Sequence, residues 1–186
     1  MQEVYYEVRL DGTIRNVSPS IEDLSRGQFR REDVIGKNLP DFYADPNQRE
    51  VFLNLLRQRG SITDYEVALR NRDGSIVPCA ISARLQRDSS GNPVKIIGNV
   101  RDITRRKKAE SLLRRQLKYE RGLVEASACL LKPDRSHQNI QKALSCLCEA
   151  ANVARVYIFE NFEDPADGLC MRQRFEFCSS DASPQI

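Results

Sequence analysis

Six cysteines and one histidine are the side chains of this 186-residue chain that best suit metal binding or nucleophilic chemistry. A structural zinc site takes four Cys or His ligands at characteristic spacings, and the chain contains no C-x-x-C pair. Cys146 and Cys148 are two residues apart in a segment with helical periodicity, so their side chains do not share a face. We therefore predict no metal site and interpret the cysteines as reduced thiols that pack like small apolar residues.

The sequence gives no support for a catalytic arrangement of residues either. The single histidine is His137, so no Ser-His-Asp combination is available in the residues before it. No glycine-rich phosphate-binding loop is present. The sequence predicts that this chain is not an enzyme, and that any catalytic domain of a longer protein lies outside it.

Arg105, Arg106, Lys107 and Lys108 form a basic run that raises the question of nucleic-acid binding. No aromatic residues interleave to stack on bases, and the net charge is only +3. We interpret the run as a solvated helix face with no nucleic-acid partner. A regulator that contacts DNA through it, the alternative, would bind in a salt-sensitive way.

Nothing in the chain has the pattern of a membrane segment. No apolar run approaches the roughly 18 residues that span a bilayer, and the first residues carry no signal-peptide pattern. We therefore expect a cytoplasmic location without membrane contact in this chain.

The first half of the chain reads as strands, short helices and strands again. Apolar and polar residues alternate over residues 4–10, 63–69, 76–85 and 94–102, and residues 13–17 follow a tight Asp-Gly turn. Helical patterns fall between Ser18 and Gly60. Since hairpins with one apolar face need a cover, we predict an α+β fold with a five-stranded antiparallel sheet and helices on one face.

The second half begins with a long helix. Thr104 is the predicted cap, and the helix is expected to continue to about Leu131. A second helix is predicted for residues 134–152, followed by strands at 153–162 and 169–180. Two helices and two strands form the start of a further α/β domain rather than a whole one.

Several motifs of residues 1–104 resemble those of a PAS domain: "DGTI" in the first hairpin, "REDVIGK", "RNRDGSIV" between two strands, and "GNVRDITRRKKAE" at the exit. Residues 105–131 are then the connecting signalling helix. Residues 132–186 resemble the incomplete N-terminal part of a GAF domain, through "ALSCLCEAANVARVYIF" and the strand pair. The resemblance implies the PAS fold and an input module of signal transduction, as in two-component sensor histidine kinases.

In the PAS family the exit motif joins the sheet to the helix, which implies signal transmission through Asp102, Ile103, Thr104 and Arg105. Asp102 matches a family aspartate that pairs with a basic residue, here Arg105 or Arg106. The alternative is a ligand-free PAS module for protein–protein interaction. His137 lies in "RSHQN", which lacks the acidic flanks of a phospho-accepting histidine in sensor kinases.

A ligand pocket between helices and sheet is the family's usual binding place, and its occupant here is left open. Haem is disfavoured because no histidine precedes His137. Covalent flavin is disfavoured because "NLPDFYADPN" has no cysteine and Val100 stands where that subclass has a glutamine. A filled core without any cofactor is the other interpretation. The candidate pocket residues for a small-molecule ligand are Leu39, Phe42, Tyr43, Phe52, Tyr65, Val67, Ile81 and Val100.

Leu113, Leu117 and Val124 form an apolar stripe on the connecting helix. The stripe spans too few heptads to identify a coiled coil by itself. Because sensors of this kind dimerise, we predict a parallel homodimer along it. The alternative is that the stripe packs against the second half of its own chain.

Overall fold

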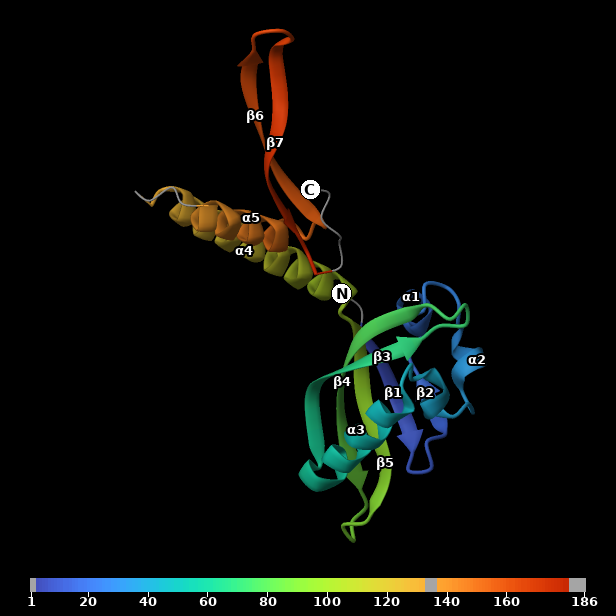
Figure 1. The fold of residues 1–186 in the computed structure, drawn as a ribbon. Coiled ribbons are helices and arrows are strands. Elements are labelled where there is room, and N and C mark those ends of the chain that lie inside the picture. Colours follow the sequence, from blue (N-terminus) through green and yellow to red (C-terminus); the bar gives the residue numbers. More distant parts are fainter. Residues whose placement is uncertain (1–2, 133–136, 181–186) are drawn as a thin grey trace. The chain divides into compact units, whose positions relative to one another are not determined.

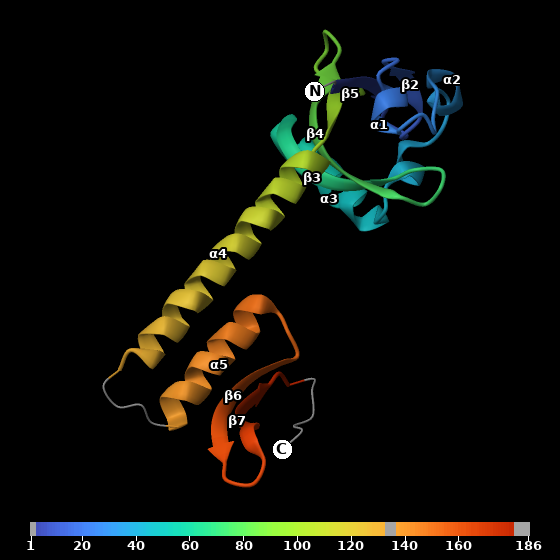
Figure 2. The ribbon, with the colours of Figure 1, turned by 90° about the horizontal axis from the view of Figure 1, so that it is seen from above.

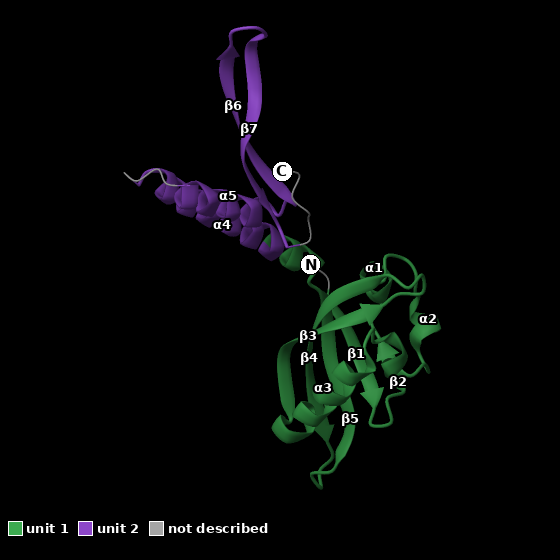
Figure 3. Ribbon diagram, in the orientation of Figure 1, with its two compact units in different colours: residues 1–109 green, residues 110–186 purple. Residues whose placement is uncertain are grey.

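The computed structural model describes residues 3–132 and 137–180 (Figure 1). The chain divides into two compact units, residues 1–109 and residues 110–186 (Figure 3). The division falls inside the long helix α4, Thr104–Leu130, which continues directly from the last strand of the first unit.

The first unit is built on one antiparallel sheet with strand order β2-β1-β5-β4-β3. This sheet confirms the predicted α+β class and its five strands. Turns of the predicted kind join the hairpins: at Gly74 the φ angle is +81°, which a glycine adopts without strain. The strands are β1 Glu3–Arg9, β2 Ile14–Val17, β3 Ser61–Arg70, β4 Ile76–Arg87 and β5 Pro93–Asp102.

Short helices cover one face of this sheet (Figure 1). The longest is α3, Pro46–Arg59, which begins where the Asp45 carboxylate accepts the N–H of Asn47 at 2.9 Å and ends at the left-handed Gly60. The other three are α1 Ile21–Leu24, α2 Arg31–Val34 and the 3-10 turn η1 Leu39–Phe42.

Alternation along the strands produces the core. Val77, Cys79, Ile81 and Ala83 of β4 are all buried, as their shared face predicts. Phe52 of α3 packs onto the same cluster and is 0% exposed. The covered face of the sheet and its helices therefore enclose one continuous apolar core.

The second unit contains the rest of α4, then α5 His137–Ala151 and a hairpin of β6 Arg155–Asp164 and β7 Gly168–Cys178. The predicted residues 134–136 of the second helix lie outside the described part of the chain. Helices α4 and α5 lie side by side (Figure 2). Gly122 permits this approach, because a Cβ on it would overlap the Cβ of Ala150.

Candidate functional site

A cavity of about 70 Å³ lies between the helices and the covered face of the sheet. Five of the eight predicted pocket residues line it: Leu39, Phe42, Tyr43, Ile81 and Val100. Apolar side chains from β1, β2, α1 and α2 complete most of the wall, and the sequence analysis did not assign these to a pocket: Val4, Ile14, Val17, Ile21, Leu24 and Val34.

The other three predicted pocket residues lie elsewhere. Phe52 and Val67 are buried in the core without lining the cavity. The ring of Tyr65 lies 5.4 Å from that of Phe52 and packs against the edge of the core. Sequence alternation identified the inward face correctly, but it carried no information on which inward residues border the same cavity.

Two tyrosines place polar atoms at the apolar wall. Tyr6 of β1 and Tyr43, which follows η1, both line the cavity and are 5% and 3% exposed. Neither hydroxyl has a hydrogen-bond partner among the described residues. Burial is the main cause that raises the pKa of both phenols above the ordinary value of 10.0. Both hydroxyls therefore remain protonated donors at neutral pH.

Arg49 of α3 is a buried charged residue next to the site, packed on Tyr43 rather than lining the cavity, and it was not predicted from the sequence. It is only 4% exposed, and its Nε and Nη1 atoms have no partner. The guanidinium lies 5.8 Å from the centroid of the Tyr43 ring and 5.6 Å from that of Phe52. The sequence did indicate that Arg49 is buried, because residue 49 is one helical turn before Phe52 and so shares its buried face.

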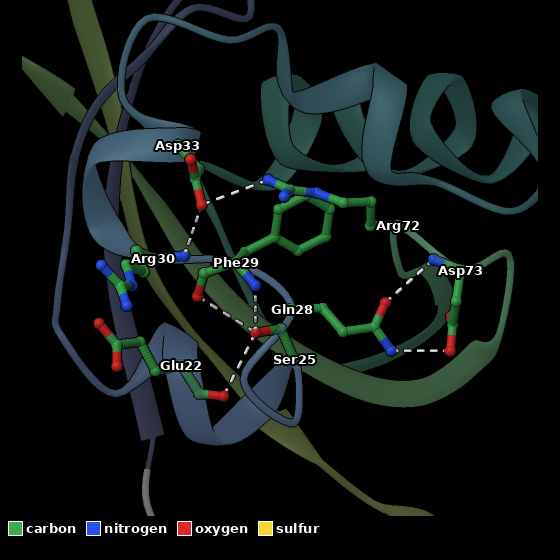
Figure 4. A network of polar contacts seen from close by, with 8 residues as sticks. All are labelled: Glu22, Ser25, Gln28, Phe29, Arg30, Asp33, Arg72 and Asp73. Atoms are coloured by element: carbon green, nitrogen blue, oxygen red, sulfur yellow. Dashed lines mark hydrogen bonds and ion pairs between the residues drawn. The ribbon is translucent and has the colours of Figure 1, made fainter.

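A polar network surrounds Phe29 on the side of the β3–β4 turn (Figure 4). Gln28 and Asp73 form a reciprocal pair: the Gln28 amide donates to the Asp73 carboxylate at 2.8 Å, and the Asp73 backbone N–H donates to Gln28 Oε1 at 3.0 Å. Arg72 lies 5.1 Å from the centre of the Phe29 ring and 3.3 Å from the Asp33 carboxylate. Since Phe29 lines the cavity, this network holds one of its walls.

The buried Ser25 fixes the chain between α1 and Phe29. Its hydroxyl oxygen accepts the backbone N–H of Phe29 at 3.0 Å, and the hydroxyl lies 3.3 Å from the carbonyl oxygens of Glu22 and Phe29 (Figure 4). Ser25 also lines the cavity. Ser25 and Phe29, near the two ends of the segment between α1 and α2, are thus hydrogen-bonded to each other at the cavity wall.

The junction between β5 and α4 is held by short local contacts. The Asp102 carboxylate accepts the backbone N–H of Thr104 at 2.6 Å, and the Ile103 N–H donates to the Pro78 carbonyl at 3.0 Å. Ile103 is 2% exposed. The helix start is therefore anchored both to its own strand and to β4.

Two details of the predicted junction are corrected. Thr104 does not cap the helix: it is the first helical residue, and its buried hydroxyl has no partner among the described residues. The Asp102 carboxylate takes the orphan amide instead, because it precedes the first turn. In the described part of the chain, the carboxylate of Asp102 forms no ion pair with Arg105 or Arg106, and Arg105 is exposed.

Glu66 of β3 is the acidic partner of the basic run. Its carboxylate lies 2.5 Å from Arg106 and also pairs with Lys107. The hydrogen bond from Lys107 lowers the pKa of Glu66, and the charge of Arg106 adds to the effect. The first turn of α4 is consequently tied to the sheet at β3 as well as at β4 and β5.

The stripe of Leu113, Leu117 and Val124 is exposed along α4. The face of α4 that packs against α5 carries Gly122, Ala126 and Cys129 instead. Among the described residues the stripe does not pack against the second half of its own chain, so that alternative is wrong.

The remaining candidates for chemistry do not line the cavity. His137 starts α5, and its ring centre is 4.7 Å from that of Phe175. All six cysteines are free thiols, and burial raises the pKa of Cys79 to about 12. None of the helices in residues 3–132 and 137–180 combines the length and apolar character needed to cross a bilayer.

Comparison with known families gives the class of the first unit. Residues 3–105 match the model of the PAS domain, so the chain belongs to the PAS domain family. This confirms the resemblance in the exit motif and the hairpins. The PAS domain is a sensory, non-catalytic module of signal transduction. The GAF resemblance of residues 132–186 lies beyond this match and stays a prediction.

The relatives are regulators. The chain is 34% identical over 122 residues to the methanogenesis regulatory histidine kinase FilI of Methanothrix harundinacea, a match that covers 65% of this chain and 14% of that protein. Two solved structures share the fold. A sensory box histidine kinase/response regulator from Burkholderia thailandensis has a TM-score of 0.50 at 19% identity, covering 64% of this chain and 90% of that one. An RNA-binding light-oxygen-voltage receptor has a TM-score of 0.53 at 20% identity, covering 62% and 33%.

Proposed function

We propose that the PAS domain senses a small molecule in its cavity and relays the change through β5 to helix α4, as the input module of a multidomain regulator such as a sensor histidine kinase. One observation carries this proposal. Val100 lines the cavity and lies on the same strand as Asp102, whose carboxylate holds the start of α4. A movement of the cavity wall therefore acts on the helix over two residues of hydrogen-bonded strand.

The position of β5 supports a transmitting role. It pairs with β1 on one side and β4 on the other, so it moves only together with the sheet. The exposed ion pairs of Glu66 are worth about 0.2 to 1 kcal/mol each. Such energies suffice to bias two states that differ by a few kcal/mol.

The rival function is a ligand-free interaction module. A cavity of about 70 Å³ with buried unpaired hydroxyls favours the sensory proposal, because a domain that acts only as a docking surface has no need of either.

The exposed stripe supports a homodimer. Leu113, Leu117 and Val124 follow one another at intervals of four and seven residues, which correspond to core positions of a heptad, with Glu120 at the core position between the last two. In the proposed dimer the α4 helices of two copies lie parallel along this stripe and carry the signal toward a GAF-like second unit and further domains.

The test is hydrogen–deuterium exchange at the amides of residues 103–108 in a Val100→Ala variant. We expect exchange there to rise several-fold, because the lost methyl groups loosen β5 at the cavity. In an Asp102→Ala background the same substitution should add little, because the contact that passes the change to α4 is already gone.

Val8→Ala is the matched control. Val8 is also buried and pairs with Ile96 near the other end of β5, but it does not line the cavity. Urea unfolding measures the loss of global stability in each variant. When the two losses are equal, Val8→Ala should leave amide exchange at residues 103–108 close to that of wild type. Equal increases in both variants would show that the cavity has no specific connection to α4.

A further inference from the structure

Four buried polar atoms without hydrogen-bond partners belong to three residues at or next to the cavity: Tyr6 and Tyr43 line it, and the Arg49 guanidinium lies 5.8 Å from the centre of the Tyr43 ring. They are the hydroxyls of Tyr6 and Tyr43 and the Nε and Nη1 atoms of Arg49, and their residues are all at least 95% buried. They come from β1, from the segment after η1 and from α3, so folding alone brings them together. Buried polar groups are nearly always hydrogen-bonded, and a cluster of exceptions in one place indicates a missing partner.

The charge of this cluster defines the missing partner. Arginine stays protonated in proteins, and in the described part of the chain no carboxylate lies within ion-pair distance of Arg49. An unpaired buried cation is costly, while an anion beside it regains the lost solvation. All four atoms are donors once the phenols are protonated, which suits an acceptor-only group such as a carboxylate.

The size and the lining of the cavity narrow the class of ligand further. A volume of about 70 Å³ accommodates about five to seven water-sized positions. Most of the wall is apolar, as at Val4, Ile81 and Val100, and the polar residues Ser25, Arg70 and Asn71 line it as well. Arg70 donates to the Ala44 carbonyl at 2.9 Å, which leaves Arg49 as the buried cation with unpartnered atoms. One such cation calls for one negative charge, and the apolar part of the wall calls for a short alkyl group.

We infer that the cavity binds a short-chain monocarboxylate, whose carboxylate lies at Tyr6, Tyr43 and Arg49 and whose alkyl group lies against the apolar wall. This ligand class rests on the proposed sensory function. The ligand links α3 to β1 and lies on the same cavity wall as Val100, so its arrival changes the environment of β5.

The test is an NMR titration of the full chain with butyrate and, separately, with the neutral isostere butyramide at matched ionic strength. We expect saturable shifts of the amide signals of Tyr6, Tyr43 and Arg49 with butyrate. Butyramide should bind at least about tenfold more weakly, because it carries no charge to meet the guanidinium. Acetate and propionate serve as shorter probes of the cavity.

Arg49→Met is the decisive variant, because it keeps the length of the side chain and removes the charge. It should remove the preference for butyrate over butyramide, whereas Arg49→Lys should keep part of it. Arg59→Met is the matched control on the exposed face of α3 and should bind butyrate like wild type. Tyr43→Phe deletes one hydroxyl and should weaken butyrate binding several-fold without changing the fold.

Equal affinity for butyrate and butyramide would overturn the inference, as would an Arg49→Met variant that keeps the preference. Absence of saturable shifts with all three carboxylates would also overturn it and assign the four atoms to internal water. Neither result touches the exchange experiment with Val100→Ala, which uses no ligand, so failure of this inference is distinguishable from failure of the relay.

Discussion

The two units of this chain use apolar residues in opposite ways. In the described residues of the first unit, sixteen buried side chains form one cluster under the helices, from Val4 to Val100. In the second unit the corresponding cluster contains Ala126, Cys129 and Ala143, while large apolar side chains such as Leu117 and Phe159 remain exposed. A sheet covered on one face completes a core, whereas a helix pair with a hairpin leaves its apolar surface for another partner.

The contrast also separates the roles of the units. The first holds a cavity, unpaired polar donors and an anchored exit helix, which are the parts of a sensor. The second offers exposed apolar positions on a continuous helix, which the proposed dimer would use. The following substitutions test this division, beginning with the largest expected effect.

Phe52→Ala should destabilise the first unit by about 3 to 5 kcal/mol, because a fully buried ring is replaced by a cavity. Phe159→Ala in β6 should change the free energy of unfolding by less than about 1 kcal/mol, since that ring is 49% exposed. Urea unfolding followed by circular dichroism measures both. Similar losses in the two variants would contradict the assignment of the main core to the first unit.

Leu117→Lys should leave the stability of the single chain nearly unchanged but weaken the proposed dimer at least about tenfold, because a charge enters an apolar seam. Native mass spectrometry across a concentration series gives the dissociation constant. Lys118→Glu, next to it on the helix and off the stripe, is the control for altered charge. A wild-type chain that stays monomeric at high concentration would contradict the dimer itself.

Glu66→Gln should have the smallest effect, below about 1 kcal/mol at neutral pH, because the carboxylate is 44% exposed and its ion pairs are partly screened. The folded pKa of Glu66 lies below 4.5, so its stabilisation is complete above that pH and is lost as the pH falls through the folded pKa. The free energies of unfolding of wild type and of Glu66→Gln should therefore converge at acid pH.

The same variant should raise exchange at residues 104–107, where the carboxylate holds the first turn of α4. Glu160→Gln is the counterpart in the second unit, because Arg172 similarly lowers the pKa of Glu160 within the β6–β7 hairpin. Glu160→Gln should leave amide exchange at the start of α4 unchanged. If both variants changed exchange at residues 104–107 alike, the Glu66 contacts would not be what anchors the helix.

Strand faces were predictable within limits that the fold explains. Val4, Tyr6 and Val8 are buried as their alternation indicates, but Leu10 and Val94, predicted on the same faces, are 47% and 52% exposed. Leu10 follows the last residue of β1, and Val94 is the second residue of β5, so both lie at strand ends. Alternation reports which way a side chain points, and only the covering layer decides whether it is buried.

Local chemistry by itself determined the hairpins, the order of strands and helices, and the continuous passage from Asp102 into α4, because turns, alternation and helix starts depend on residues close in sequence. The contact by which Asp102 rather than Thr104 caps the helix is also local, since it spans two residues. The tertiary structure alone decided that Glu66 meets the basic run. It also placed Arg49 beside two buried phenols. These contacts join segments distant in the chain, and their geometry exists only once the sheet and its covering helices have packed.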